Sequence, residues 1–182
     1  MNLMDAILNS GGSPVSQISR KFGLGETEVT TAISSLLPAL TNGIKKNVSQ
    51  KGGLEGLLGA LNSGGHERYL EDPEALSREE AVSDGNGILG HLLGSKDVSR
   101  QLAGRASKNT GISAGILKKI LPLVAGLAMG ALNKQGNKSG VLTQAKKSRS
   151  SSGLGSLISL LDSDGDGSPI DDILGIAGKL FS

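Results

Sequence analysis

Apolar residues recur at intervals of three to four along the chain, and no stretch alternates convincingly at the period of two that marks a half-buried strand. Val15, Ile18 and Phe22 predict a helix that begins at Ser13 and Pro14, since serine caps helices and proline suits their first position. Two further predicted helices have apolar faces at Val29, Ile33 and Leu36-Leu37, and at Leu54, Leu57-Leu58 and Leu61. The pattern therefore predicts an all-α fold.

The motif Leu36-Leu37-Pro38 in the first half of the chain reappears as Ile120-Leu121-Pro122 in the second half. A glycine turn at Gly23 or Gly111 precedes each copy. The number of residues from the glycine to the proline is larger in the first copy by about one helical turn, so the apolar residues stay on the same face of the helix. Proline within a helical pattern predicts a kink or a restart of the helix. We interpret the two halves as related helical hairpin units; two unrelated hairpins that share the motif by chance are the alternative.

Charge is unevenly distributed along the chain. Seven acids and two arginines lie between residues 62 and 87, whereas five bases and no acid lie between residues 133 and 153. Both segments lack a sustained apolar face, and we interpret them as linkers. The predicted organisation is a first helical unit (1–62), an acidic linker (63–87), a second helical unit (88–132), a basic Gly/Ser linker (133–153) and a C-terminal helix, acidic loop and helix (154–182).

The composition excludes several classes of protein. The chain has no cysteine, which rules out disulfides and thiolate chemistry, and only three aromatic residues, which disfavours a base-stacking platform. The longest apolar run, Ile120 to Leu132, is shorter than a membrane span requires, and the N-terminus lacks the basic leader of a secretory signal. We expect a cytoplasmic protein with no membrane span.

Several short motifs together carry a family resemblance. They are Gly85-Asn86-Gly87-Ile88-Leu89-Gly90-His91-Leu92-Leu93-Gly94, Ile120-Leu121-Pro122, Asp162-Ser163-Asp164-Gly165-Asp166-Gly167 and Asp171-Asp172-Ile173-Leu174-Gly175. With these motifs the chain resembles the bacterial domain of unknown function family 937, a group of YidB-like all-helical proteins. The resemblance implies a fold and a bacterial distribution. It implies no activity and no catalytic residues.

The candidate chemistry is an acidic loop near the C-terminus. Asp162, Asp164 and Asp166 alternate before a turn glycine, so that their carboxylates converge as in a calcium loop, and Ser168 would offer its carbonyl. Asp171 would close the loop early, because the usual final glutamate position holds an isoleucine. We therefore expect weak or structural Ca²⁺ binding. A solvated turn with Ser168 as the cap of the following helix is the alternative.

A second candidate is nucleic-acid binding. Residues 18–29 have the spacing of a helix-turn-helix motif, but the helix that would enter the groove begins with Glu26 and Glu28, which repel phosphates. The related hairpin in the second half of the chain is more basic, but the spacing of residues at its turn differs from that of the motif. Its bases are Arg100, Arg105, Lys108, Lys118 and Lys119. A structural hairpin is favoured over DNA recognition.

Two further matches lack the strand that their chemistry needs. Gly111-Ile112-Ser113-Ala114-Gly115 fits the nucleophile elbow of hydrolases, and Gly85, Gly87 and Gly90 fit a dinucleotide-binding turn. We expect no enzyme. The favoured function is a non-enzymatic scaffold or self-associating protein with a possible calcium-binding C-terminal loop. A nucleic-acid-associated protein that uses the hairpin and the basic linker is the alternative.

Overall fold

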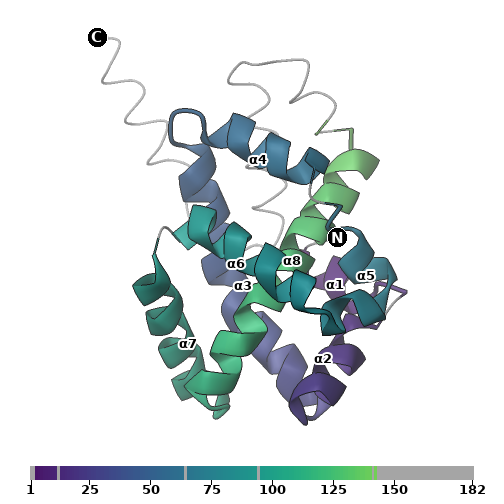
Figure 1. Ribbon diagram of the computed structural model, residues 1–182, viewed down its shortest axis with the longest axis vertical. Helices are drawn as coiled ribbons and strands as arrows, with labels where there is room; N and C mark the ends of the chain where they lie inside the picture. The colour runs from purple at the N-terminus through teal and green to yellow at the C-terminus, as the bar shows by residue number, and fades with distance from the viewer. Residues whose placement is uncertain (1–2, 12, 64, 94, 141, 143–182) are drawn as a thin grey trace.

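The helix α8 (Ala114–Lys138) runs through the centre of the protein in a computed structural model (Figure 1). The structure describes residues 3–11, 13–63, 65–93, 95–140 and 142. All residues from 120 to 132 are buried, so α8 is the element around which the other helices pack. The 18-residue apolar window of α8 also meets the length and composition of a membrane span, but 78% of that window is buried inside the protein. Burial on all sides explains this composition.

The remaining described elements are helices joined by short turns. In chain order they are α1 (Leu3–Leu8), α2 (Pro14–Phe22), α3 (Glu26–Val48), α4 (Gly53–Ser63), α5 (Arg68–Glu71), the 3₁₀ helix η1 (Pro73–Ser77), α6 (Glu79–Leu93) and α7 (Lys96–Thr110). No strand occurs in these described residues, which confirms the all-α prediction. Figure 1 shows α3 and α8 crossing along the length of the protein, with α2 and α7 near one end and α4 near the other.

Local signals set several of the helix ends. The α2 helix begins at Pro14 as predicted, but the Ser13 side chain makes no capping hydrogen bond and its φ of 46° is left-handed. Gly23 (φ 65°) and Gly111 (φ 76°) end α2 and α7 in the left-handed conformation that glycine adopts without strain. The Ser113 hydroxyl accepts a hydrogen bond from the Ile116 N–H at 3.4 Å and so caps α8. A hairpin with a glycine turn therefore occurs in each half of the chain. The duplication itself stays a prediction.

The two prolines do not restart their helices. Pro38 lies inside α3 and Pro122 inside α8, and both helices continue through them. Pro38 is exposed, whereas Pro122 is buried. The α6 helix crosses α8 at Pro122: a Cβ on Gly85 would lie 2.7 Å from the Pro122 Cα and closer still to its carbonyl group. Glycine at this position therefore allows two helix backbones to touch.

The acidic segment is part of the core, and its interpretation as a linker is wrong. Residues 63–87 contain α5, η1 and the first part of α6, and Tyr69, Leu70 and Leu76 are buried. The acids stay at the surface while these apolar residues turn inward. The linker interpretation of residues 133–153 is also wrong for its start, because α8 extends to Lys138.

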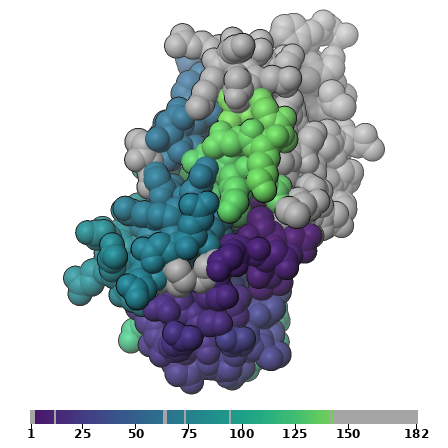
Figure 2. Space-filling model, turned by 90° about the vertical axis from the view of Figure 1, so that its right-hand side faces the viewer, coloured from purple at the N-terminus to yellow at the C-terminus, as the bar shows by residue number. Residues whose placement is uncertain are grey.

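Small residues on α8 let this acidic segment pack closely. A Cβ on Gly126 would lie 3.2 Å from the Tyr69 ring, and one on Gly130 would lie 2.5 Å from the His66 carbonyl oxygen. These two glycines therefore let residues of the acidic segment lie directly against α8. Figure 2 shows the C-terminal turns of α8, in green, reaching the surface above α1, in purple.

Candidate functional site

The predicted calcium ligands lie outside the described residues. These are Asp162, Asp164, Asp166, Ser168 and Asp171. Within the described part of the chain, no group of three or more His, Asp or Glu side chains could hold a metal ion. The site that the structure does describe is a cavity.

A cavity of about 790 Å³ lies between the end of α3, α4, the start of α5, α6 and α8. This volume is within the range of small-molecule sites. Its walls are formed by Asn47, Gln50, Lys51, Gly52, Gly53, Gly56, Leu57, Gly59, Ala60, His66, Arg68, Asp84, Ile88, His91, Leu92 and Met129.

The tight turn between α3 and α4 shapes one wall. Gly52 has a φ of 79°, which favours glycine, and a Cβ on Gly53 would overlap the backbone of Asn47. The turn therefore folds α4 back beside the end of α3. Gly56 then faces the cavity without a side chain, and a Cβ there would meet no atom within 4 Å. The missing side chain keeps this part of the cavity open.

The lining of the cavity is apolar at its base and polar at its edge. Leu57, Ile88 and Met129 are 5%, 8% and 2% exposed, so they form a buried apolar floor. The exposed side chains of Lys51 and His91 stand at the rim. Such a lining suits a molecule with an apolar body and a polar group.

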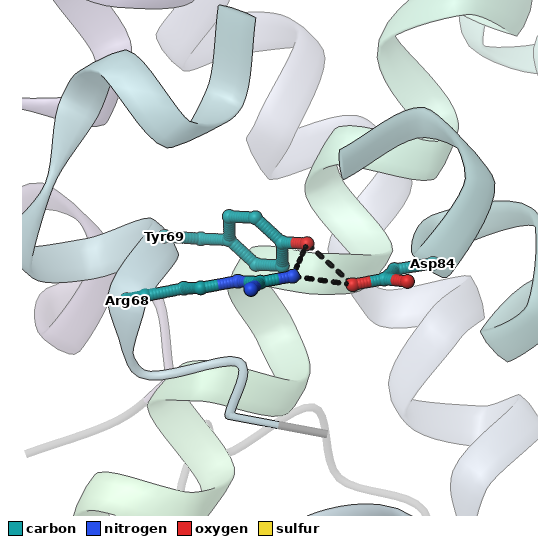
Figure 3. Close-up of polar contacts among 3 residues, drawn as sticks. All are labelled: Arg68, Tyr69 and Asp84. Carbon is teal, nitrogen blue, oxygen red and sulfur yellow. Dashed lines mark hydrogen bonds and ion pairs between the residues drawn. The ribbon is translucent and has the colours of Figure 1, made fainter. Parts of the chain in front are cut away.

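Three side chains hold one wall of the cavity together (Figure 3). The Asp84 carboxylate of α6 accepts hydrogen bonds from the Tyr69 hydroxyl at 2.6 Å and the Arg68 guanidinium at 2.9 Å, both from α5. The same guanidinium donates to the Tyr69 oxygen at 2.9 Å and lies over the Tyr69 ring. Because the Tyr69 ring rests against Gly126, this network joins α5, α6 and α8.

The network keeps Tyr69 and Arg68 in their ordinary ionisation states. Burial and the hydrogen bond to Asp84 raise the pKa of the Tyr69 hydroxyl, so the phenol stays protonated at neutral pH. The hydrogen bonds to Tyr69 and Asp84 raise the pKa of Arg68, which therefore remains a cation. Asp84 already accepts two hydrogen bonds on one oxygen, so the network stabilises the wall and offers no activated nucleophile.

His66 lines the cavity and is 5% exposed. Its ring stacks on Tyr69 with 6.1 Å between centroids, and its Nδ1 atom has no hydrogen-bond partner among the described residues. Burial lowers the pKa of His66, with Asp84 opposing this effect, so the ring is neutral at neutral pH. A buried polar atom without a partner costs roughly 1–3 kcal/mol, which a water or ligand offsets by bonding to it.

The other sequence motifs have structural roles. Ser113 caps α8, so the Gly-x-Ser-x-Gly match is a helix start, and Gly85, Gly87 and Gly90 all lie inside α6. In the helix-turn-helix candidate, the Glu28 carboxylate accepts a hydrogen bond from the Gly25 N–H at 2.7 Å and thereby caps α3. His91 is exposed in the last turn of α6.

Sequence reasoning missed this cavity. Arg68, Tyr69 and Asp84 lie within the segment interpreted as a linker, and His66 was placed there too. One signal was present: the chain has one tyrosine and two histidines, and the tyrosine and one histidine fall three residues apart. A rare aromatic residue in a polar segment indicates an apolar contact.

A comparison with family models matches residues 5–135 to the family described as "Bacterial protein of unknown function (DUF937)". The match covers well over half of the chain and includes every residue of the cavity wall. Comparisons with curated proteins and with solved structures give no match.

Proposed function

The chain belongs to the DUF937 family of bacterial proteins of unknown function, and on that premise we propose that it is a non-enzymatic binding protein. Its ligand is a small amphipathic molecule, which occupies the cavity between α4, α6 and α8. The supporting observation is the lining of this 790 Å³ cavity, with buried Leu57, Ile88 and Met129 below and polar side chains at the rim.

The charges at the cavity favour a ligand with a negatively charged group. Arg68 and Asp84 neutralise each other through their ion pair at 2.9 Å. Lys51 at the rim has no carboxylate partner among the described residues. A carboxylate, sulfonate or phosphate on the ligand would pair with Lys51 while its apolar body contacts the floor.

A fluorescence titration with 8-anilinonaphthalene-1-sulfonate tests this proposal, because the dye has apolar rings and one sulfonate. We compare the full chain with Gly56→Leu and Gly87→Leu. A leucine at position 56 would add a bulky side chain to the cavity wall, whereas Gly87 lies on α6 outside the cavity lining with open space around it. Both changes replace a helical glycine with a strong helix former, so both variants are expected to fold.

The expected result is saturable dye binding to the unmodified chain and to Gly87→Leu, with at least a tenfold loss in Gly56→Leu. Equal binding by all three proteins would place the dye elsewhere and refute the cavity as the site. A Lys51→Gln variant should weaken binding of the sulfonate, which separates the charge argument from the volume argument.

The calcium loop and self-association remain proposals of their own. Among the described residues, the large apolar side chains that are exposed are Leu8 and Val98, which do not form an extended apolar face. The described helices thus offer little for a dimer interface. We propose that the chain self-associates through the apolar C-terminal residues Ile173, Leu174, Ile176 and Phe181. Light scattering against concentration tests this, and a monodisperse monomer at high concentration would contradict it.

A further inference from the structure

The hairpin of α7 and the start of α8 has an exposed basic face. Residues 96–119 contain six bases and one acid, Asp97, a net charge of +5. We call these bases the basic face; all of them are exposed. They are Lys96, Arg100, Arg105, Lys108, Lys118 and Lys119.

Helix geometry places two bases of the basic face, Arg105 and Lys108, away from the core. Ala103 and Ala106 are 1% and 2% exposed and mark the inner side of α7. Arg105 and Lys108 each follow one of these alanines by two positions, a rotation of about 200° that turns them to the outer side. Figure 1 shows α7 at the edge of the protein, with its outer side uncovered by the other labelled helices.

Most bases of this face form no ion pair with the described residues. Arg100 pairs with Asp97 at 2.8 Å, and both side chains are more than half exposed, so this pair is weak. The other five bases have no carboxylate partner among the described residues. Elsewhere in the protein bases do find partners, as Lys134 does with Glu71 and Arg68 with Asp84. The face therefore retains positive charge for an external anion.

The residue types distinguish between anionic partners. Residues 96–119 contain no aromatic side chain on which an unpaired base could stack, which disfavours single-stranded nucleic acid. Val98 is the one large apolar side chain exposed on this hairpin, so insertion into a membrane gains little. Lys96 and Lys108 lie about 18 Å apart along α7, close to the length of five base pairs.

We propose that the basic face binds the phosphate backbone of double-stranded DNA without sequence preference. The bases contact phosphates along the duplex and release counterions from it, which supplies the free energy of binding. This inference is independent of the cavity, which lies on the side of α6 and α8 that faces α4.

Fluorescence anisotropy with a fluorescein-labelled 20-base-pair DNA tests the proposal on the full chain. With four to six phosphate contacts, affinity should fall roughly 10²–10³-fold between 50 and 200 mM salt. The variant Arg105→Glu/Lys108→Glu should bind on the order of 10²-fold more weakly at low salt. The control Arg20→Glu/Lys46→Glu makes the same change in net charge at exposed bases outside the face, and should lose much less affinity.

Three results would overturn the proposal. They are the absence of binding at 50 mM salt, an equal loss in the two double variants, and full affinity in Arg105→Glu/Lys108→Glu. The last would assign binding to bases elsewhere in the chain. Vesicles with 30% phosphatidylserine serve as a competing anionic surface. Sedimentation with these vesicles but no binding to DNA would identify a membrane partner and reject the duplex.

Discussion

Gly85 of α6 touches the backbone of Pro122 in α8. We therefore predict that a methyl group added at Gly85 will push α6 and α8 apart. In Gly85→Ala, the added Cβ would lie 2.7 Å from the Pro122 Cα and closer to its carbonyl carbon and oxygen. An ordinary contact of 3.4 Å with the Pro122 Cα alone needs about 0.7 Å of movement between the helices, and the nearer carbonyl group needs more. Both sides of the contact are backbone, so no side-chain rotation relieves it.

Two opposing effects set the magnitude. Overpacking a core costs about 1–3 kcal/mol, and a backbone contact belongs at the upper end of this range. Alanine gains about 1 kcal/mol over glycine in helix propensity. We therefore expect Gly85→Ala to lose about 2 kcal/mol of unfolding free energy, which lowers Tm by roughly 4–8 °C in a chain of this size.

Gly87→Ala is the matched control, because it lies two residues away in α6 with nothing within 4 Å of the added Cβ. It should gain about 0.4–1 kcal/mol. Urea denaturation followed by circular dichroism measures both variants. If Gly85→Ala is as stable as Gly87→Ala, α6 and α8 do not touch at this point, and the crossing described above is wrong.

Three further predictions concern the cavity wall and the acidic loop. The unfolding free energy should fall as pH drops below about 6.5, because the unfolded chain protonates His66 at a higher pH than the folded chain does; His66→Phe should remove this component, and His91→Phe should retain it. Asp84→Ala and Tyr69→Phe should each lose about 1 kcal/mol, measured in urea, and the double variant less than their sum, because both remove the same hydrogen bond. Calcium should raise the melting midpoint of the full chain and leave that of Asp164→Ala unchanged; the same rise in both proteins would reject the acidic loop.

The sequence did not reveal that the acidic segment, residues 63–87, is part of the core. The acidic segment was misread because Tyr69, Leu70 and Leu76 belong to short elements, α5 and η1, which are too brief to show a helical period. The Tyr69 ring packs against Gly126, which lies nearly sixty residues further along the chain. No local pattern connects these positions.

The sequence by itself determined the all-α class, the family and some of the helix ends. Caps such as Ser113 and turns such as Gly23 and Gly111 act through hydrogen bonds and backbone angles within a few residues, so they can be read locally. Only the tertiary structure decided which glycines hold backbones together, as Gly85 does, and which leave open space, as Gly56 does. The residue type is the same in both cases. What differs is that packing brings Pro122, which is distant in sequence, against Gly85 and brings no atom against Gly56.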